Sequence, residues 1–101
     1  MITVLKSKIN ELQIEFCNPE CEGSITIPQE IMHKANLYPY ERVEVNSKYG
    51  KGRISTYVIP GDRVELNGGA SNHFKVGDIV HVNSFMDITE TLALVWKPTI
   101  V

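Results

Sequence analysis

Cysteine is scarce in this sequence: Cys17 and Cys21 are the only two in 101 residues. A structural zinc site normally needs four ligands, and the three histidines are scattered at positions 33, 73 and 81, away from the C-x₃-C pair. Disulfides are rare inside cells. We therefore expect free thiols, no bound metal and a cytoplasmic protein.

Long hydrophobic runs and an excess of one charge are also missing. No apolar run approaches the roughly 20 residues that span a bilayer, and the N-terminal Met1–Lys6 lacks the layout of a signal peptide. The net charge is −2 and the pI about 5.9, so no general attraction to nucleic acid or anionic lipid is expected. We predict neither a membrane nor a nucleic-acid partner.

What the sequence does have is short β-rich segments separated by Gly, Pro and Asn. With 101 residues and 43% hydrophobic content, it predicts one domain, 1–101. Alternation and β-branched enrichment predict strands at 2–7, 12–16, 24–27, 42–46, 53–59, 64–66, 77–85 and 91–96. Pro28 suits a first helical turn, so 28–37 is predicted to be a helix. The fold class predicted is mainly β, a small closed β-barrel with one or two short helices.

The dipeptide Gly23-Ser24 carries chemistry that a turn does not need. Glycine leaves its carbonyl carbon open to approach and tolerates strained backbone angles, and serine places a hydroxyl next to that carbonyl. If the fold holds the hydroxyl over the carbonyl, an N→O acyl shift and β-elimination would cleave the chain and leave a pyruvoyl group at position 24. A Gly-Ser pair alone is usually just a loop, so other motifs must decide.

Five blocks in order supply those motifs, and together they run almost from end to end. They are Lys8, Glu22-Gly23-Ser24, Gly52-Arg53-Ile54-Ser55-Thr56-Tyr57, Asn67-Gly68-Gly69-Ala70 and Val76-Gly77-Asp78-Ile79-Val80. In this set the chain resembles the aspartate 1-decarboxylases, the pyruvoyl-dependent enzymes that make β-alanine from L-aspartate for pantothenate synthesis. The resemblance implies a double-psi β-barrel, assembled as a homotetramer with active sites between neighbouring subunits.

The resemblance also implies how the chain would mature. Ser24 becomes the pyruvoyl group, which forms a Schiff base with the substrate, and Gly23 supplies the scissile carbonyl. Cleavage between them gives a β chain, 1–23, and an α chain, 24–101. Thr56 is similar to the threonine that assists this self-cleavage, most simply by hydrogen-bonding the Gly23 carbonyl oxygen as charge develops there.

Substrate roles follow from the same resemblance. Tyr57 matches the tyrosine that returns a proton to the product, and Arg53 and Lys8 match the cations that hold the two carboxylates. Arginine makes bidentate contacts with a carboxylate, which suits a site that must release only the α-carboxylate. The loop of Asn67, Gly68, Gly69 and Ala70 resembles the one that lines the pocket with backbone amides.

Judged singly, these residues have ordinary interpretations. Tyr57 would be a packing residue, Arg53 a solvated charge at a strand edge, and Asn67–Ala70 a turn. The family also usually has an aromatic residue at position 21 and often a tryptophan at 46, where this chain has Cys21 and Asn46. These differences leave open the substrate preference and the need for a maturation factor.

Two other functions stay open from the sequence. Residues 23–45 also resemble the swapped-hairpin domain of bacterial transition-state regulators and antitoxins, which bind DNA. Such modules need a basic surface for phosphate contacts, and this chain is slightly acidic. The other possibility is a barrel subunit that never processes itself and serves as a scaffold.

Overall fold

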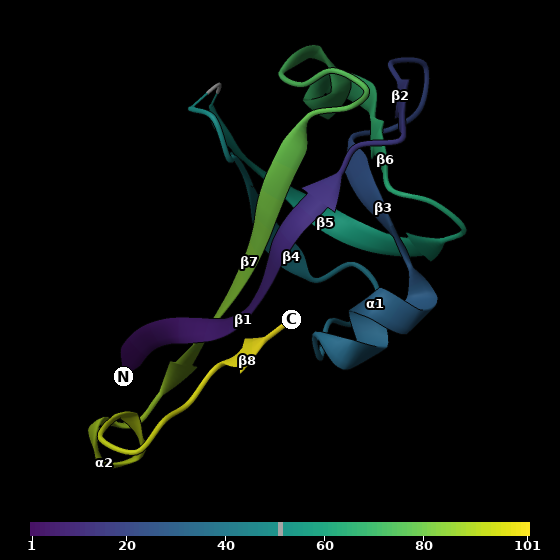
Figure 1. Ribbon diagram of the computed structural model, residues 1–101. Helices are drawn as coiled ribbons and strands as arrows, with labels where there is room; N and C mark the ends of the chain where they lie inside the picture. The colour runs from purple at the N-terminus through teal and green to yellow at the C-terminus, as the bar shows by residue number, and fades with distance from the viewer. Residues whose placement is uncertain (51) are drawn as a thin grey trace.

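One mixed β-sheet organises the chain. The structure is a computed structural model that describes residues 1–50 and 52–101, and its eight strands follow the order β2-β6-β3-β5-β4-β7-β1-β8 (Figure 1). The strands are β1 (Ile2–Gln13), β2 (Phe16–Asn18), β3 (Ser24–Pro28), β4 (Arg42–Ser47), β5 (Arg53–Gly61), β6 (Glu65–Asn67), β7 (Ile79–Ile88) and β8 (Thr99–Ile100). The helices are α1 (Gln29–Lys34), α2 (Glu90–Ala93) and the 3₁₀ helix η1 (Gly68–Asn72).

The strands curl around a core of aliphatic side chains. Four neighbouring pairs in the described sheet are antiparallel, whereas β1–β8, β2–β6 and β3–β5 run parallel, the last from the pair Ile25–Val58 onward. Because side chains alternate across a strand, one face of each of the strands β1, β3, β4, β5 and β7 is apolar and turned inward. The core includes Ile9, Ile25, Ile27, Val43, Val45, Val58, Leu66, Val80 and Val82, each no more than 2% exposed. The mainly β prediction is confirmed; closure of the barrel remains a prediction.

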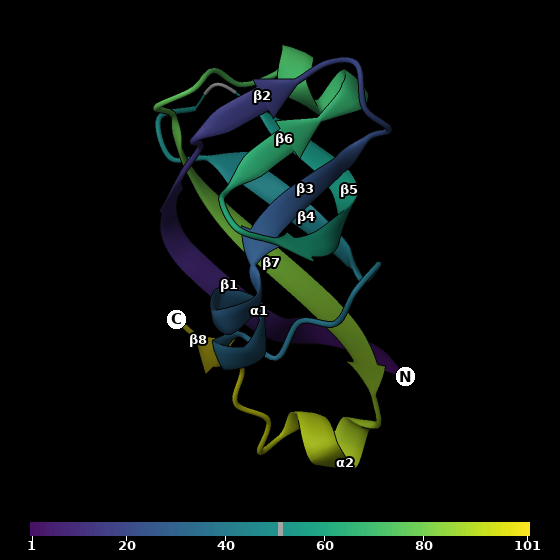
Figure 2. The same ribbon diagram turned by 90° about the vertical axis from the view of Figure 1, so that its right-hand side faces the viewer.

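An arm extends from this core. It consists of the start of β1, the end of β7, α2 and β8, and it lies away from β2, β3 and β6 in both ribbon views (Figures 1 and 2). The molecule is correspondingly elongated, with extents of 44 × 26 × 21 Å. No helix in the described part of the chain is long and apolar enough to cross a membrane.

The central strands agree closely with their predictions, but the first does not. Two strands were predicted at 2–7 and 12–16, whereas β1 is one strand over Ile2–Gln13. Its register against β7 shifts between Leu5 and Ser7 and again between Ile9 and Leu12. Glu11 has a φ of 56° in the second irregularity, so the chain bulges there and continues instead of turning.

The strand predicted at 91–96 is wrong. Glu90–Ala93 forms helix α2, and the Thr89 hydroxyl accepts a hydrogen bond from the Leu92 N–H. This hydroxyl satisfies an N–H that the helix itself cannot pair. The alternation of Leu92, Leu94 and Trp96 is typical of a strand and led to the wrong prediction. The N-cap at Thr89 favours a helix at these positions instead.

Two other predictions need smaller corrections. The helix predicted at 28–37 is confirmed but shorter, since α1 covers Gln29–Lys34 with Pro28 at its N-cap. Asn36 then takes a φ of 58°, a left-handed conformation that ends helices. The predicted loop at Asn67–Ala70 is instead the end of β6 followed by η1.

Candidate active site

Ser24 lies at the start of β3, between β5 and β6. Across to β6, Ser24 pairs with Asn67 and Thr26 pairs with Glu65. Since Ile25 and Ile27 point into the core, the alternating side chains of Ser24 and Thr26 point to the opposite, outer face of the sheet. This alternation places a row of polar side chains on strands whose inner face is apolar.

The Ser24 hydroxyl is buried and held by an amide. Ser24 is 3% exposed, and Asn67 Nδ2 donates to its Oγ at 2.9 Å and to Thr26 Oγ1 at 3.0 Å. With the amide nitrogen donating, the O–H hydrogen of Ser24 is left to donate elsewhere. Asn67 Oδ1 is itself buried and has no partner within the described residues. An unpaired buried acceptor costs about 1–3 kcal/mol, and Asn46 Oδ1 and Asn83 Oδ1 are likewise buried and unpaired among the described residues.

A cavity of about 280 Å³ opens above this row of side chains. It is lined by Cys21, Glu22, Ser24, Thr26, Tyr40, Tyr57, Ile59, Glu65 and Asn67. The structure therefore brings together three of the residues expected from the sequence: Ser24, Tyr57 and Asn67. The cavity (the Ser24 pocket below) has a hydroxyl, a phenol and an amide within it.

Other expected residues lie on the far side of the Gly23-Ser24 peptide. A second cavity, of about 360 Å³, is lined by Gly23, Ile54, Ser55, Thr56, Gly69, Ala70 and His73. Thr56 and Tyr57 are consecutive in β5, so their side chains point to opposite faces. The Gly23-Ser24 junction thus lies between two cavities, with Thr56 on the glycine side and Tyr57 on the serine side.

Gly68 holds the segment before this junction in place. Its φ is +61°, and a Cβ built there would lie 2.5 Å from the Cys21 carbonyl oxygen and 2.6 Å from the Gly23 nitrogen. Only glycine permits so close an approach at that angle. The Ser71 hydroxyl donates to the Gly68 carbonyl at 2.7 Å within η1, which stabilises the helical turn that begins at Gly68.

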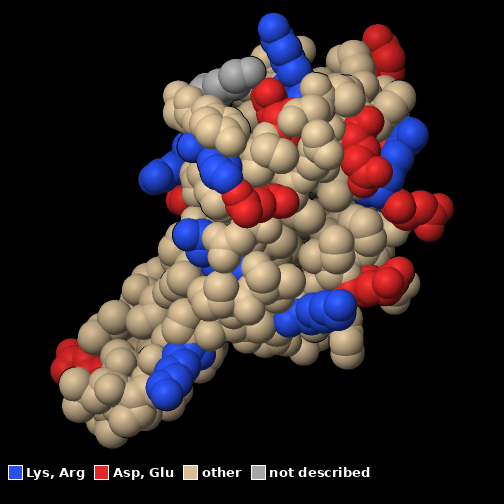
Figure 3. Space-filling view, viewed as in Figure 1, with Lys and Arg blue, Asp and Glu red and all other residues tan. Residues whose placement is uncertain are grey.

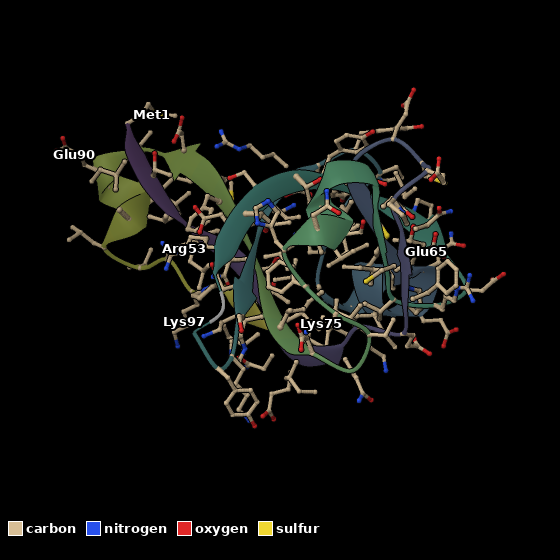
Figure 4. The ribbon with its side chains drawn as sticks, turned by 90° about the horizontal axis from the view of Figure 1, so that it is seen from above. Met1, Arg53, Glu65, Lys75, Glu90 and Lys97 are labelled. Atoms are coloured by element: carbon tan, nitrogen blue, oxygen red, sulfur yellow. The ribbon has the colours of Figure 1, made fainter. Side chains whose placement is uncertain are left out.

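The two expected cations do not reach the Ser24 pocket within one chain. Arg53 begins β5 four residues before Tyr57, about 13 Å along the strand, and its side chain is 71% exposed. Lys8 pairs with Asn83 across β1 and β7, which places it three strands from β5. Figure 4 shows Arg53 and the pocket residue Glu65 on opposite sides of the curled sheet.

Several pocket residues were missed by the sequence analysis. Thr26 and Glu65 could have been found from alternation, because each lies two residues from a motif residue on a predicted strand. Tyr40 had no such signal, because it reaches the pocket through a turn whose position depends on β5. Cys21 and Glu22 reach the pocket because they directly precede Gly23 and Ser24 in the chain.

Cys17 is half-buried and, unlike Cys21, does not line the Ser24 pocket. Burial raises the pKa of the Cys17 thiol, and the nearby Asp78 and Glu65 carboxylates raise it further. Its Sγ donates to the Phe74 carbonyl at 3.7 Å, so it behaves as a small packing residue. Among the described residues, no group of three or more His, Cys, Asp or Glu could hold a metal ion.

Fold and pocket define a class: a small mainly β protein whose polar pocket is built around a buried serine that follows a glycine. Comparison with known proteins gives the family. The aspartate decarboxylase family model matches residues 1–101, and the chain belongs to this family.

Relatives with the name aspartate 1-decarboxylase support this family assignment. The chain is 41% identical over 92 residues to the aspartate 1-decarboxylase of Sulfurihydrogenibium sp. (strain YO3AOP1), covering 87% of this chain and 69% of that one. It is 43% identical over 89 residues to the aspartate 1-decarboxylase of Coprothermobacter proteolyticus, covering 84% and 74%. With that of Phocaeicola vulgatus it is 39% identical over 107 residues, covering 100% and 90%. The family match also includes 23–45, where the DNA-binding resemblance rested.

Proposed function

We propose that this chain is an aspartate 1-decarboxylase, converting L-aspartate to β-alanine and CO₂ with a pyruvoyl group made from Ser24. One observation carries the proposal. In a chain of this family, the hydroxyl that follows Gly23 is 3% exposed and is held by Asn67 Nδ2 at 2.9 Å. A serine in an ordinary surface turn would need neither the burial nor the amide.

Self-cleavage would use both sides of the junction. The Ser24 oxygen attacks the Gly23 carbonyl carbon and the peptide nitrogen leaves with the hydroxyl proton, which gives an ester; elimination then releases the Gly23 carboxylate and separates 1–23 from 24–101. Hydrolysis of the dehydroalanine left at position 24, with water supplying the ketone oxygen and ammonia leaving, gives the pyruvoyl group. The open space around Gly23, where a Cβ would meet nothing within 4 Å, leaves its carbonyl accessible. Thr56 lines the cavity on that side, where its hydroxyl can donate to the carbonyl oxygen as negative charge develops.

Turnover would use the serine side. When present, the pyruvoyl carbonyl supplies the electron sink for loss of CO₂. Tyr57 lines the Ser24 pocket, where its phenol can donate a proton to the substrate carbon that loses CO₂. Asn67 keeps an amide in the same pocket, and the side chain of Ile59 provides an apolar wall.

The substrate's carboxylates would be held by a second copy of the chain. The Ser24 pocket is lined by two carboxylates, Glu22 and Glu65, and its described lining includes no Lys or Arg. A dicarboxylate such as aspartate needs cations, and Arg53 and Lys8 lie elsewhere on the outer face. We propose that these two residues of one subunit complete the pocket of its neighbour.

The arm supports such an assembly. Large apolar side chains on it are exposed, among them Met1 at 81%, Leu94 at 87% and Val95 at 71%. Figure 3 shows few charged residues on the visible face of the arm. Exposed apolar groups gathered in this way mark protein interfaces, and we propose that they bury one another in a homotetramer.

A denaturing mass spectrum tests the proposal. We expect two fragments divided after Gly23, the larger beginning with a ketone that borohydride reduces, and release of CO₂ from L-aspartate. A chain that stays intact after prolonged warming, also with a cell extract that could supply a maturation factor, would instead identify a non-processing barrel. Cleavage without CO₂ release would leave the self-processing in place and reject aspartate as the substrate.

A further inference from the structure

Tyr40 has a backbone conformation that its side chain disfavours. Its φ is +68°, in the left-handed region that bulky residues rarely adopt. Packing in the core does not explain this backbone conformation, because Tyr40 is 75% exposed. Strained residues of this kind persist where the surrounding structure fixes them, often at functional sites.

The turn that carries Tyr40 is fixed at both ends. The Tyr40 N–H donates to the Val58 carbonyl at 2.7 Å, and the Val58 N–H donates to the Glu41 carbonyl at 3.0 Å. The Glu41 carboxylate accepts from Lys6 Nζ at 2.9 Å and from the Tyr38 N–H at 3.1 Å. The turn is therefore attached to β5 immediately after Tyr57, and to β1 through Lys6.

This attachment places one tyrosine ring against another. The ring centroids of Tyr40 and Tyr57 are 5.7 Å apart, with the planes tilted by 34°, and both residues line the Ser24 pocket. Offset aromatic pairs at this distance attract. The Tyr57 hydroxyl makes no hydrogen bond to the described residues, so the direction of its phenol depends on packing of the ring.

We propose that Tyr40 is a positioning residue that acts through Tyr57, holding the phenol of Tyr57 over the reacting carbon. The inference rests on the proposed function, in which Tyr57 is the proton donor. It assigns no part of self-cleavage to Tyr40, because the glycine side of the junction faces the other cavity.

The variant that tests it is Tyr40→Asn, since asparagine tolerates the left-handed conformation and so preserves the turn while removing the ring. Tyr49→Asn is the matched control: Tyr49 is 73% exposed, nearly as much as Tyr40, but lies outside the pocket lining. In the Ser24→Ala chain, ring-labelled tyrosine gives four sets of NMR signals, one for each tyrosine. Tyr40→Asn should move the Tyr57 signals and Tyr49→Asn should not.

Kinetics complete the test on processed enzyme. Tyr40→Asn should cleave after Gly23 as usual, keep KM and the melting temperature, and lower kcat roughly 10- to 100-fold, the loss typical of a misplaced catalytic group. In a Tyr57→Phe background the same change should have no further effect, because Tyr40 acts through that phenol.

Three results would overturn the inference. They are an unchanged kcat in Tyr40→Asn, an equal loss of kcat in both backgrounds, or Tyr57 signals that do not move. Normal turnover in Tyr57→Phe alone would remove the proton donor from the proposed function, and the inference with it. Loss in Tyr57→Phe beside normal turnover in Tyr40→Asn rejects the inference and leaves the proposed function standing.

Discussion

The Ser24 pocket and the face that carries Arg53 and Lys8 are built in opposite ways. In the pocket, the central groups are buried and joined by neutral hydrogen bonds, with Asn67 Nδ2 donating to two hydroxyls at 2.9 and 3.0 Å. On the part of the outer face that carries Arg53 and Lys8, which we call the cation face, the Arg53 charge lies in water. The Arg53 side chain is 71% exposed, and its Nε is 4.0 Å from Glu44 Oε1.

This difference indicates a division of labour within one chain. Breaking and making bonds at Ser24 needs a dry, fixed environment in which developing charge is stabilised. Recognising two carboxylates needs cations, which remain solvated until a ligand or a partner covers them. The pocket's described lining has no Lys or Arg, and the cation face lacks the buried serine. We therefore expect that self-cleavage and carboxylate binding can be disabled separately.

The largest effect should come from Ser24→Ala. Removing the hydroxyl removes the nucleophile, so we expect no cleavage after Gly23 and no CO₂ release, measured by mass spectrometry and by aspartate assay. Ser84→Ala is the control, since Ser84 is also buried but bonds to Ser7 at 2.6 Å, away from the pocket. Ser84→Ala should cleave normally, and cleavage of the Ser24→Ala chain would reject the proposed chemistry.

Arg53→Ala should disable the cation face alone. Loss of a charge-assisted hydrogen bond costs about 1.5–3 kcal/mol, so KM for aspartate should rise by roughly 10- to 100-fold with cleavage unchanged. Lys34→Ala is a suitable control, because Lys34 is an exposed cation in the last turn of α1 and does not line the Ser24 pocket; it should leave KM unchanged.

Co-expression sharpens this prediction. If one subunit's cations serve the neighbour's pocket, a mixture of Ser24→Ala and Arg53→Ala chains should contain some intact sites and recover part of the activity at low aspartate. A mixture no more active than Arg53→Ala alone would place both regions of a site in the same chain.

Gly68→Ala should distort the Ser24 pocket without removing any of its reacting side chains. A methyl group at φ +61°, 2.5 Å from the Cys21 carbonyl oxygen, must push the segment 21–23 away, at a cost of about 1–3 kcal/mol. We expect a lower melting temperature and cleavage slowed by roughly 10-fold, because the junction is displaced. Gly69→Ala, where a Cβ meets nothing within 4 Å, should change neither; equal effects of the two would contradict the role given to Gly68.

The pocket was only half predictable from the sequence. Strands β3, β4 and β5 follow from alternation and β-branched residues, and Ser24, Tyr57 and Asn67 from motifs. The place of Tyr40 does not follow, because it depends on hydrogen bonds to Val58 far along the chain. The separation of Arg53 from the pocket was also hidden, because a motif gives residue types but not the strand order that places them.

The smallest effect should come from Lys48→Met, which breaks a partly exposed ion pair with Glu11 outside the Ser24 pocket. The hydrogen bond from Lys48 is the main reason that the pKa of Glu11 lies below its ordinary value of 4.5. A lowered carboxyl pKa adds stability above the unfolded value, and this stability is lost as the pH falls through the folded pKa. Lys48→Met should therefore lower the melting temperature slightly near pH 7, and this difference should shrink as the pH falls through the folded pKa of Glu11, measured by calorimetry beside Lys97→Met. The rate of cleavage at Ser24 should not change in either variant, since its hydrogen bonds involve no ionisable group; a slower rate in Lys48→Met would mean that the two regions are coupled.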